Sequence, residues 1–427
     1  MRALCALVSL LATLEAGLAL DFTVDCMDRI GPVTSLNGVN AGPAHIKGRL
    51  TDLSMQYRAM GINLVRTHDY YDLIDLSNIF PHGFGADPVN PANYDFAGAD
   101  SVIDAIEQAG CGVMFRLGES WYQPPHNTIP PDTDTFVEVC MHIMGHYGCA
   151  QATPHKSRIR LWEFYNEPQI DRFWDRKADP GLSRFYTLYA ATAAAASQHY
   201  PHVLFGGPGS AGADDAGIEA YCRDFCAAIS RDPRHPPLDF YSWHSYNRNL
   251  EGPYVFARQA RKVRAVLDEA GFGKTLNVLD EYNVCSMRVG GDNPSADDLS
   301  WRAAMSNVDG AAFLTAALIY LHQYSDVRYA CRYRGDIHGG DGGYGLCRDD
   351  GSIKKPGWAL RAYSGLFPRR IRVPQREHGC HVRRRYRQGG CCRPLPRAHG
   401  DYRRAGKLHQ RPHRAVVPRA GGFLPSA

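Results

Sequence analysis

Two glutamates, Glu167 and Glu281, each follow a short apolar segment, and together they could hydrolyse a glycosidic bond. Glu167 stands in IRLWEFYNEPQIDRFW, residues 159–174, and Glu281 stands in LNVLDEYN, residues 276–283. Hydrolysis of a glycosidic bond needs one carboxylic acid to protonate the leaving oxygen and a second carboxylate to attack the sugar carbon or to activate water. An asparagine lies close to each glutamate, Asn166 and Asn283. The two segments therefore predict a catalytic pair of carboxylates.

Each glutamate also has a non-catalytic interpretation. Glu167 precedes Pro168, so it could begin a helix with its carboxylate near the positive end of the helix dipole. Glu281, beside Asp280, could be a solvated loop charge. The occurrence of both at equivalent strand ends favours catalysis over these alternatives. Glu163 lies within the preceding strand, between two aromatic residues, and we expect it to be structural.

Eight β-rich segments are expected to form the strands that position these residues. They are residues 33–39, 62–68, 112–118, 159–165, 202–207, 239–244, 276–281 and 326–333. Most are followed by a helix-like stretch, and several of these stretches end in glycine, the residue expected just past a helix C-terminus. Strands alternating with helices predict parallel pairing, and eight such units predict an α/β fold of the (β/α)8 barrel type. A doubly wound sheet is the main rival, but GGPGSAG, residues 206–212, lacks the acidic residue expected about 20 positions further on.

In a barrel of this type, catalytic groups stand at the C-terminal ends of the strands. The segments of Glu167 and Glu281 are the fourth and seventh strands, which lie three strands apart around the ring. The two carboxylates could therefore face each other across the mouth of the barrel.

The ordered motifs of the chain resemble those of clan A glycoside hydrolases, and most closely glycoside hydrolase family 39, the family of β-xylosidases and α-L-iduronidases. The supporting motifs are WEFYNEP, LVRTHD, GGPGS, LDFYSWHSYN, LDEYN and GDGGYGLCRDDGSIKKPGWALRAYSGL. They occur in the family's order and cover nearly all of residues 32–367. Two features depart from the family: Tyr165 stands where a tryptophan is usual, and residues 321–336 lack the expected tryptophan-rich text.

The resemblance implies a role for each residue of the site. Glu167 corresponds to the general acid/base, Glu281 to the nucleophile, and Asn166 to the residue that holds the sugar 2-hydroxyl. Four further residues correspond to the walls of the sugar pocket: His244, Tyr246, His68 and Arg66. His244 could instead be a core histidine satisfied by the backbone, and Arg66 could form a structural ion pair rather than touch substrate.

The proposed mechanism and the aromatic residues lead to two further expectations. Glu167 has to remain protonated at working pH, whereas Glu281 should be ionised and hydrogen-bonded. Stacking walls for sugar rings could come from Trp121, Tyr122, Trp174 and Trp243, although buried packing is the commoner role of tryptophan.

Both ends of the chain differ from the middle. Residues 1–19 combine Arg2, an apolar run and small residues before a cut after Ala19, as in a secretory signal, although an apolar N-terminal helix is the alternative. Residues 369–427 contain 16 of the 48 Lys and Arg but only two of the 44 Asp and Glu. A tail of this composition, without apolar periodicity, cannot bury a core. It is either a polyanion-binding arm or the product of a reading-frame error. We favour the reading-frame error, because the tail carries three cysteines and a basic arm rarely does.

We therefore predict a signal at residues 1–19, a catalytic (β/α)8 domain at residues 20–368 and a basic tail at residues 369–427. The predicted protein is a secreted or periplasmic retaining glycosidase, most like a β-xylosidase, that acts on an oligosaccharide, polysaccharide or glycoside. We expect no cofactor, no metal, no membrane, and no nucleic acid unless the tail is genuine; Cys222 and Cys226, four residues apart, suit neither a zinc pair nor a disulfide. The alternatives are another clan A activity, such as an endo-β-glycanase or a uronic-acid glycosidase, or a non-catalytic carbohydrate- or polyanion-binding protein.

Overall fold

The computed structural model describes most of the predicted catalytic domain. The described residues are 34–43, 52–149, 155, 157–212, 214–246, 251–284, 300, 303–339 and 343–367. The predicted signal at residues 1–19 and the predicted tail at residues 369–427 lie outside them. Within the described segments, no helix combines the length and the apolarity needed to cross a bilayer.

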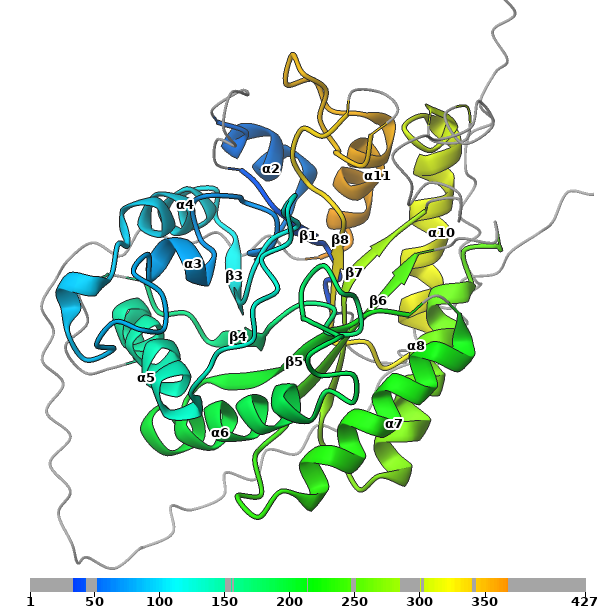
Figure 1. Cartoon of the computed structure of the whole chain (residues 1–427). Coiled ribbons are helices and arrows are strands. Elements are labelled where there is room, and N and C mark those ends of the chain that lie inside the picture. The colour runs from blue at the N-terminus through cyan, green and yellow to red at the C-terminus, as the bar shows by residue number, and fades with distance from the viewer. Residues whose placement is uncertain are drawn as a thin grey trace, which may run out of the picture. The chain divides into compact units, whose positions relative to one another are not determined.

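Eight parallel strands form a closed barrel in which neighbours in the chain are neighbours in the sheet (Figure 1). The predicted (β/α)8 barrel is thereby confirmed, and each of the eight predicted segments overlaps a strand, with bounds that differ by up to five residues. The strands are β1 (Gly38–Asn40), β2 (Leu64–Arg66), β3 (Gly112–Leu117), β4 (Leu161–Phe164), β5 (Leu204–Ser210), β6 (Phe240–Tyr246), β7 (Leu276–Asn283) and β8 (Tyr329–Arg332). Pairing of β1 with β8 closes the ring.

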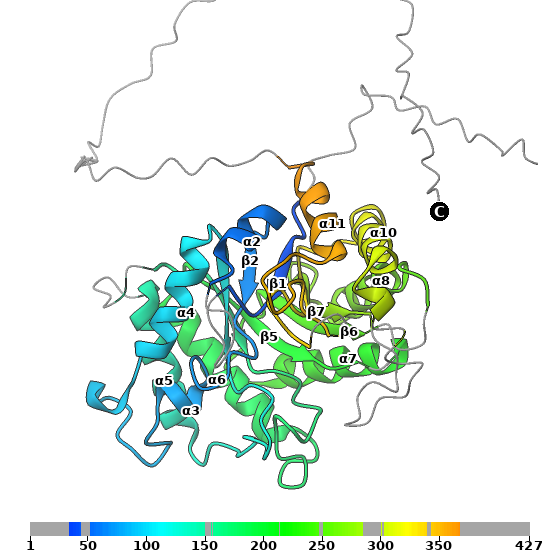
Figure 2. The same cartoon turned by 90° about the horizontal axis from the view of Figure 1, so that it is seen from above.

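The helices surround the strands, as Figure 2 shows from above. They are α2 (Ser54–Met60), α3 (Leu76–Ile79), α4 (Ala97–Gln108), α5 (Thr133–Met144), α6 (Ser183–His199), α7 (Asp215–Arg231), α8 (Val255–Glu269), α10 (Val308–Tyr324) and α11 (Lys355–Ser364), with the short turns η1 (Pro91–Asn93) and η2 (Gly145–Cys149). In both views α2 and α11 lie side by side, so the ends of the barrel domain meet where β1 joins β8.

Local sequence explains where several helices begin and end. The carboxylate of Asp132 accepts a hydrogen bond from the Thr135 amide and begins α5, and Asp214 accepts from the Gly217 amide at the start of α7. Gly61 ends α2 in the left-handed conformation, with φ of 71°. Cys222 and Cys226 are both buried on α7 and both are free thiols.

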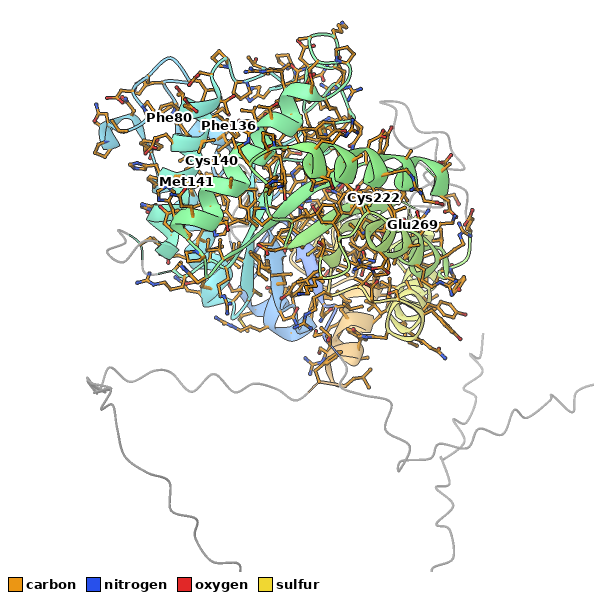
Figure 3. All side chains as sticks on the ribbon, turned by 90° about the horizontal axis from the view of Figure 1, so that it is seen from below. Phe80, Phe136, Cys140, Met141, Cys222 and Glu269 are labelled. Carbon is orange, nitrogen blue, oxygen red and sulfur yellow. The ribbon has the colours of Figure 1, made fainter. Side chains whose placement is uncertain are left out.

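The larger apolar core lies between the helices and the outside of the barrel. Phe136 of α5 packs edge-on against Phe164 of β4, with ring centroids 5.9 Å apart. Phe80, Phe136 and Cys140, labelled in Figure 3, are all buried in this layer. This layer fixes the distance between the strands and the helices, and so holds the strand ends in place.

The inside of the barrel changes from apolar to charged along the strands. A smaller buried cluster contains Leu64, Met114, Leu161 and Val278 from four different strands. Because side chains on the same face of a strand are two residues apart, the next side chains on that face are Arg66, Arg116, Glu163 and Asp280. All four are fully buried. The barrel therefore carries a layer of ionisable side chains directly beneath its mouth.

Candidate active site

A β-bulge brings two consecutive acidic residues of β7 to the same site. The pairing of β6 with β7 runs from Trp243 opposite Leu279 to His244 opposite Glu281, and thus skips Asp280. Consecutive residues of a regular strand point to opposite faces, whereas a bulge allows both to face the same way. Both side chains are buried and both contact Arg66. Glu281 is therefore not a solvated loop charge.

Arg66, at the end of β2, is the centre of the charged layer. Its Nε lies 2.5 Å from Glu163 Oε2 and 3.0 Å from Asp280 Oδ2, and its Nη1 donates to Glu281 Oε2 at 3.1 Å. Nη1 also donates to Asn40 Oδ1 at 3.0 Å. The guanidinium is fully buried, so Arg66 forms a structural ion-pair network that orients Glu281 rather than an exposed substrate contact.

His244 connects Glu167 to Asp280, the residue that precedes Glu281. Its Nδ1 lies 2.8 Å from Glu167 Oε1, and its Nε2 lies 3.2 Å from Asp280 Oδ2. One carboxylate oxygen of Glu167, one of Glu281 and a ring nitrogen of His244 all lie within 4.8 Å of one another. His244 is thus satisfied by side chains of the site and not by the backbone, and the two glutamates meet across the mouth as predicted.

Burial and charge determine the protonation of this cluster. Burial raises the pKa of Glu281 to about 7, an increase to which Glu167 adds and which His244, Arg66 and Tyr246 oppose. Burial likewise raises the pKa of Glu163 to about 8 despite the charge of Arg66. Although burial alone would lower it, the carboxylates of Glu281, Asp280 and Glu167 raise the pKa of His244 well above its usual value. We expected Glu281 to be ionised, whereas its pKa is raised. The reason is that this carboxylate is buried and lies close to Glu167.

Among the buried polar atoms of the site that have no protein partner in the described residues are Asn166 Nδ2 and His68 Nδ1. Asn166 Oδ1 accepts a hydrogen bond from Arg66 Nη2 at 2.8 Å, and since a guanidinium can only donate, the amide NH₂ must point elsewhere. Burial and the charges of Arg66 and Arg116 hold the pKa of His68 well below its usual value, so this ring is neutral. Both groups can therefore hydrogen-bond to hydroxyl groups of a ligand.

Tyr246 and two residues that sequence reasoning missed complete the wall around Glu281. The Tyr246 hydroxyl donates to Glu281 Oε1. Tyr333, one residue beyond β8, donates to Asp69 Oδ2 at 2.6 Å, and Asp69 Oδ1 lies 3.4 Å from His68 Nε2. Tyr333 stands in the stretch where a tryptophan was expected, and its aromatic ring was the available signal.

A glycine of β5 allows these groups to approach one another. Gly209 has φ of 59°, and a Cβ built there would lie 3.0 Å from Arg66 Nη2 and 3.3 Å from His244 Nε2. Its carbonyl accepts a hydrogen bond from the Glu167 amide at 2.9 Å. Glu167 itself has φ of 39°, a conformation that a non-glycine residue adopts only when its surroundings enforce it. The glycine-rich GGPGS segment is thus part of the support for Glu167.

The seven residues predicted from the sequence all lie in this one cluster. Six are linked by the contacts of Glu281, Arg66 and His244 described above, and His68 Nε2 lies 3.8 Å from Glu281 Oε2. They are Glu167, Glu281, Asn166, His244, Tyr246, His68 and Arg66. Of the four aromatic residues considered as stacking walls, Trp174 and Trp243 are fully buried, whereas Trp121 is 46% exposed. Sequence reasoning gave Asp280 no role in the site, although its period-two spacing from Val278 was a signal for the face that it occupies.

The atoms of Glu167, His244 and Glu281 also have the spacing of a metal site, and they form the one such group in the described part of the chain. A protonated imidazole has no lone pair to offer a metal, and the surrounding carboxylates favour protonation of His244. In this arrangement His244 is a hydrogen-bond donor to two carboxylates. The prediction that the protein needs no metal or cofactor stays a prediction.

Comparison with known proteins agrees with this geometry. Residues 37–270 match the sequence profile described as "Glycosyl hydrolases family 39". A glucosidase from Croceicoccus marinus has a similar structure, with a TM-score of 0.66 at 26% identity, and the match covers 79% of this chain and 69% of that one. A monomeric β-xylosidase from Caulobacter crescentus CB15 gives a TM-score of 0.55 at 19% identity over 78% and 69% of the two chains. The GH39 enzyme from Xanthomonas axonopodis pv. citri gives a TM-score of 0.54 at 19% identity, and the match covers 79% of this chain and 67% of that one. No curated protein sequence matches the chain.

Proposed function

The chain belongs to glycosyl hydrolases family 39, and from this premise we propose that it is a retaining glycosidase in which Glu281 is the nucleophile and Glu167 the general acid/base. That the protein is a glycoside hydrolase with a carbohydrate substrate follows from the family match. The retaining mechanism, the sugar and the roles of individual residues are our proposals.

The separation of the two carboxylates carries the proposal. An oxygen of Glu167 lies within 4.8 Å of an oxygen of Glu281. Retaining enzymes place their carboxyl groups about 5 to 5.5 Å apart, whereas inverting enzymes keep them about 6.5 to 9.5 Å apart to leave room for a water molecule. The short separation supports direct attack by a carboxylate on the sugar carbon.

In the first step, a carboxylate oxygen of Glu281 bonds to the anomeric carbon while the bond to the leaving oxygen breaks. Glu167 gives its proton to that oxygen. Arg66 and Tyr246 hold one oxygen of Glu281 each, so the nucleophile is oriented before substrate arrives. Asn166 Nδ2, a buried donor without a protein partner, is available for the sugar 2-hydroxyl, where hydrogen bonds strengthen in the transition state.

In the second step, Glu167 removes a proton from water, the oxygen of that water bonds to the anomeric carbon, and the ester to Glu281 breaks. Esterification removes the charge of Glu281, which lies close to Glu167 and favours the protonated form of its neighbour. Loss of that charge makes it easier for Glu167 to give up its proton and act as base. His244 Nδ1 lies 2.8 Å from Glu167 Oε1 and is placed to hydrogen-bond to this carboxylate during the second step.

For the sugar, β-xyloside is our first candidate, on the ordered motifs that resemble this family of β-xylosidases. A β-glucoside is the second candidate, because the structure at 26% identity is that of a glucosidase. Release of xylose or of glucose from a panel of aryl β-glycosides distinguishes the two.

We also propose that the mature protein works outside the cytoplasm, secreted or in a periplasm. The signal-like composition of residues 1–19 supports this location. Mass spectrometry of the protein isolated from its natural source should find an N-terminus close to Leu20; an intact N-terminus at Met1 would contradict it.

A fluorinated glycoside tests the mechanism directly. A 2-deoxy-2-fluoro glycoside with a good leaving group traps the glycosyl-enzyme ester, and the labelled peptide should be the one that contains Glu281. The Glu281→Ala protein, with unchanged folding, should take up no label. Label on another carboxylate, or an inverted anomer as the first product by NMR, would reject the proposed roles.

A further inference from the structure

One exposed tryptophan stands beside the candidate active site. Among the exposed aromatic residues of the described chain are Trp121, Tyr324 and Trp358. Tyr324 and Trp358 lie on the outer helices α10 and α11. Trp121 lies on the segment that follows β3, at the mouth of the barrel, and is 46% exposed.

Contacts connect Trp121 to the candidate nucleophile in short steps. The Trp121 amide donates to Asp69 Oδ1 at 2.9 Å, and that same oxygen lies 3.4 Å from His68 Nε2. The Trp121 ring meets Phe173 edge-on at 5.7 Å between centroids, and Phe173 in turn lies 5.8 Å from the His68 ring. His68 Nε2 is 3.8 Å from Glu281 Oε2. Trp121 therefore lies just outside the residues that surround Glu281, where the ring next to the cleaved sugar would be placed.

The exposed ring is held in place from several sides. The guanidinium of Arg172 lies over it, 4.8 Å from its centroid, and donates to the Tyr122 carbonyl at 2.8 Å and to the Gln123 side chain. Asp69, which anchors the Trp121 amide, has φ of 59°, in the left-handed region that non-glycine residues rarely adopt. A large apolar ring that is fixed yet half-exposed loses little entropy when a ligand covers it.

We infer that Trp121, supported by Arg172 and Phe173, is a platform for a second ring of the glycoside, next to the sugar whose anomeric carbon lies between Glu167 and Glu281. This inference rests on the proposed function. The apolar C–H face of a sugar ring, or the face of an aromatic ring, is the surface that an indole face attracts. The protein therefore prefers substrates with at least two rings over single-ring glycosides.

The test compares two substrates of the same sugar, a β-glycosyl fluoride and a β-1,4-linked trisaccharide, taken in both the xylose and the glucose series. The fluoride has no second ring, so the ratio of kcat/KM for trisaccharide to kcat/KM for fluoride isolates the platform. Trp121→Ala should lower this ratio about two- to twelvefold, mainly through KM, because the second ring loses the aromatic face on which it stacks. Trp121→Phe should restore much of the ratio.

Trp358→Ala is the matched control, since Trp358 is 49% exposed and also lies under an arginine, Arg361, at 5.9 Å, but on α11. It should leave the ratio unchanged. The platform alone would be overturned if Trp121→Ala lost activity equally with both substrates and so left the ratio unchanged. It would also be overturned if the wild-type protein cleaved the fluoride but not the trisaccharide. A wild-type protein that cleaves neither fluoride would overturn the proposed function and the platform together.

Discussion

Replacement of Arg66 by methionine removes the cation at the centre of the charged layer. The guanidinium is fully buried and lies within 3.1 Å of Glu163, Asp280 and Glu281. Removing one partner of a buried ion pair costs about 3 to 5 kcal/mol, because a buried charge is left without compensation. We expect a loss of this size in the free energy of unfolding at about pH 8, because the three acids are ionised to a greater extent there than at lower pH.

The same replacement should also change the pH dependence of catalysis. The charge of Arg66 lowers the pKa of Glu281, which burial raises to about 7. Without Arg66 this pKa rises further, and since the nucleophile must be ionised, the acidic limb of kcat/KM should move to higher pH by about one unit, or about 1.4 kcal/mol. Arg66→Lys should lie between the two proteins, because an ammonium keeps the charge but cannot donate to all of these partners at once.

Urea unfolding at about pH 8 and pH 4.5, together with the pH profile of kcat/KM, measures both effects. At the lower pH more of the acids are protonated in either state, so the stability difference between Arg66→Met and wild type should shrink. Arg223→Met is the control: Arg223 pairs with Glu269 at 3.0 Å, but both side chains are more than half exposed. Such a pair contributes about 0 to 1 kcal/mol. Equal midpoints for the two methionine variants, with an unchanged acidic limb, would refute the reasoning.

Further predictions concern the neighbours of this cluster. Burial raises the pKa of Glu163 to about 8; because this folded value is above the unfolded one, its contribution to stability is full below about pH 4.3 and declines as pH rises towards 8. Glu163→Gln should flatten that decline in urea titrations between about pH 5 and 8, and an unchanged slope would contradict it. Glu167→Ala should lower kcat/KM for an alkyl glycoside about 10² to 10⁴-fold but the glycosylation step with a fluoride far less, since fluoride leaves without a proton; equal losses in stopped-flow measurements would argue against an acid. Gly209→Ala should reduce kcat/KM at least about tenfold, because the added Cβ displaces Arg66; full activity would show that the site tolerates it. Asn166→Ala should weaken turnover of the natural sugar by about 1 to 3 kcal/mol and that of its 2-deoxy analogue much less, and a similar loss for both would exclude a contact to the 2-hydroxyl.

Much of the fold could be predicted from the sequence because the barrel is built from a local, repeated pattern. Each β-rich segment precedes a polar end and most precede an amphipathic helix, and the alternation predicts parallel strands whose C-terminal ends meet on one side. The helix caps at Asp132 and Asp214 are likewise local features. For the same reason Glu167 and Glu281 could be placed at one mouth without knowledge of any contact between them.

Other features depended on pairing between distant segments. The bulge that brings Asp280 and Glu281 to one side is a property of the register between β6 and β7, which neither segment specifies alone. Glu163 was rightly expected to be structural, but its partners, Arg66 and Asp280, come from strands about 100 residues away in either direction. The spacing from Leu161 predicts which face Glu163 occupies and not which charges it meets.

By itself, the sequence determined the strand order, the family-like motifs and the side of the barrel at which the polar residues gather, because these follow from periodicities of two and 3.6 residues within short segments. Only the tertiary structure decided that the two carboxylates approach within 4.8 Å, that the pKa of His68 is lowered while that of His244 is raised, and that Trp121 is the exposed tryptophan of the mouth. The distance between the carboxylates, the burial of each side chain and the charges around it all depend on residues that are far apart in the chain. They are determined only when β2, β4, β6 and β7 place their C-terminal ends together in the closed barrel.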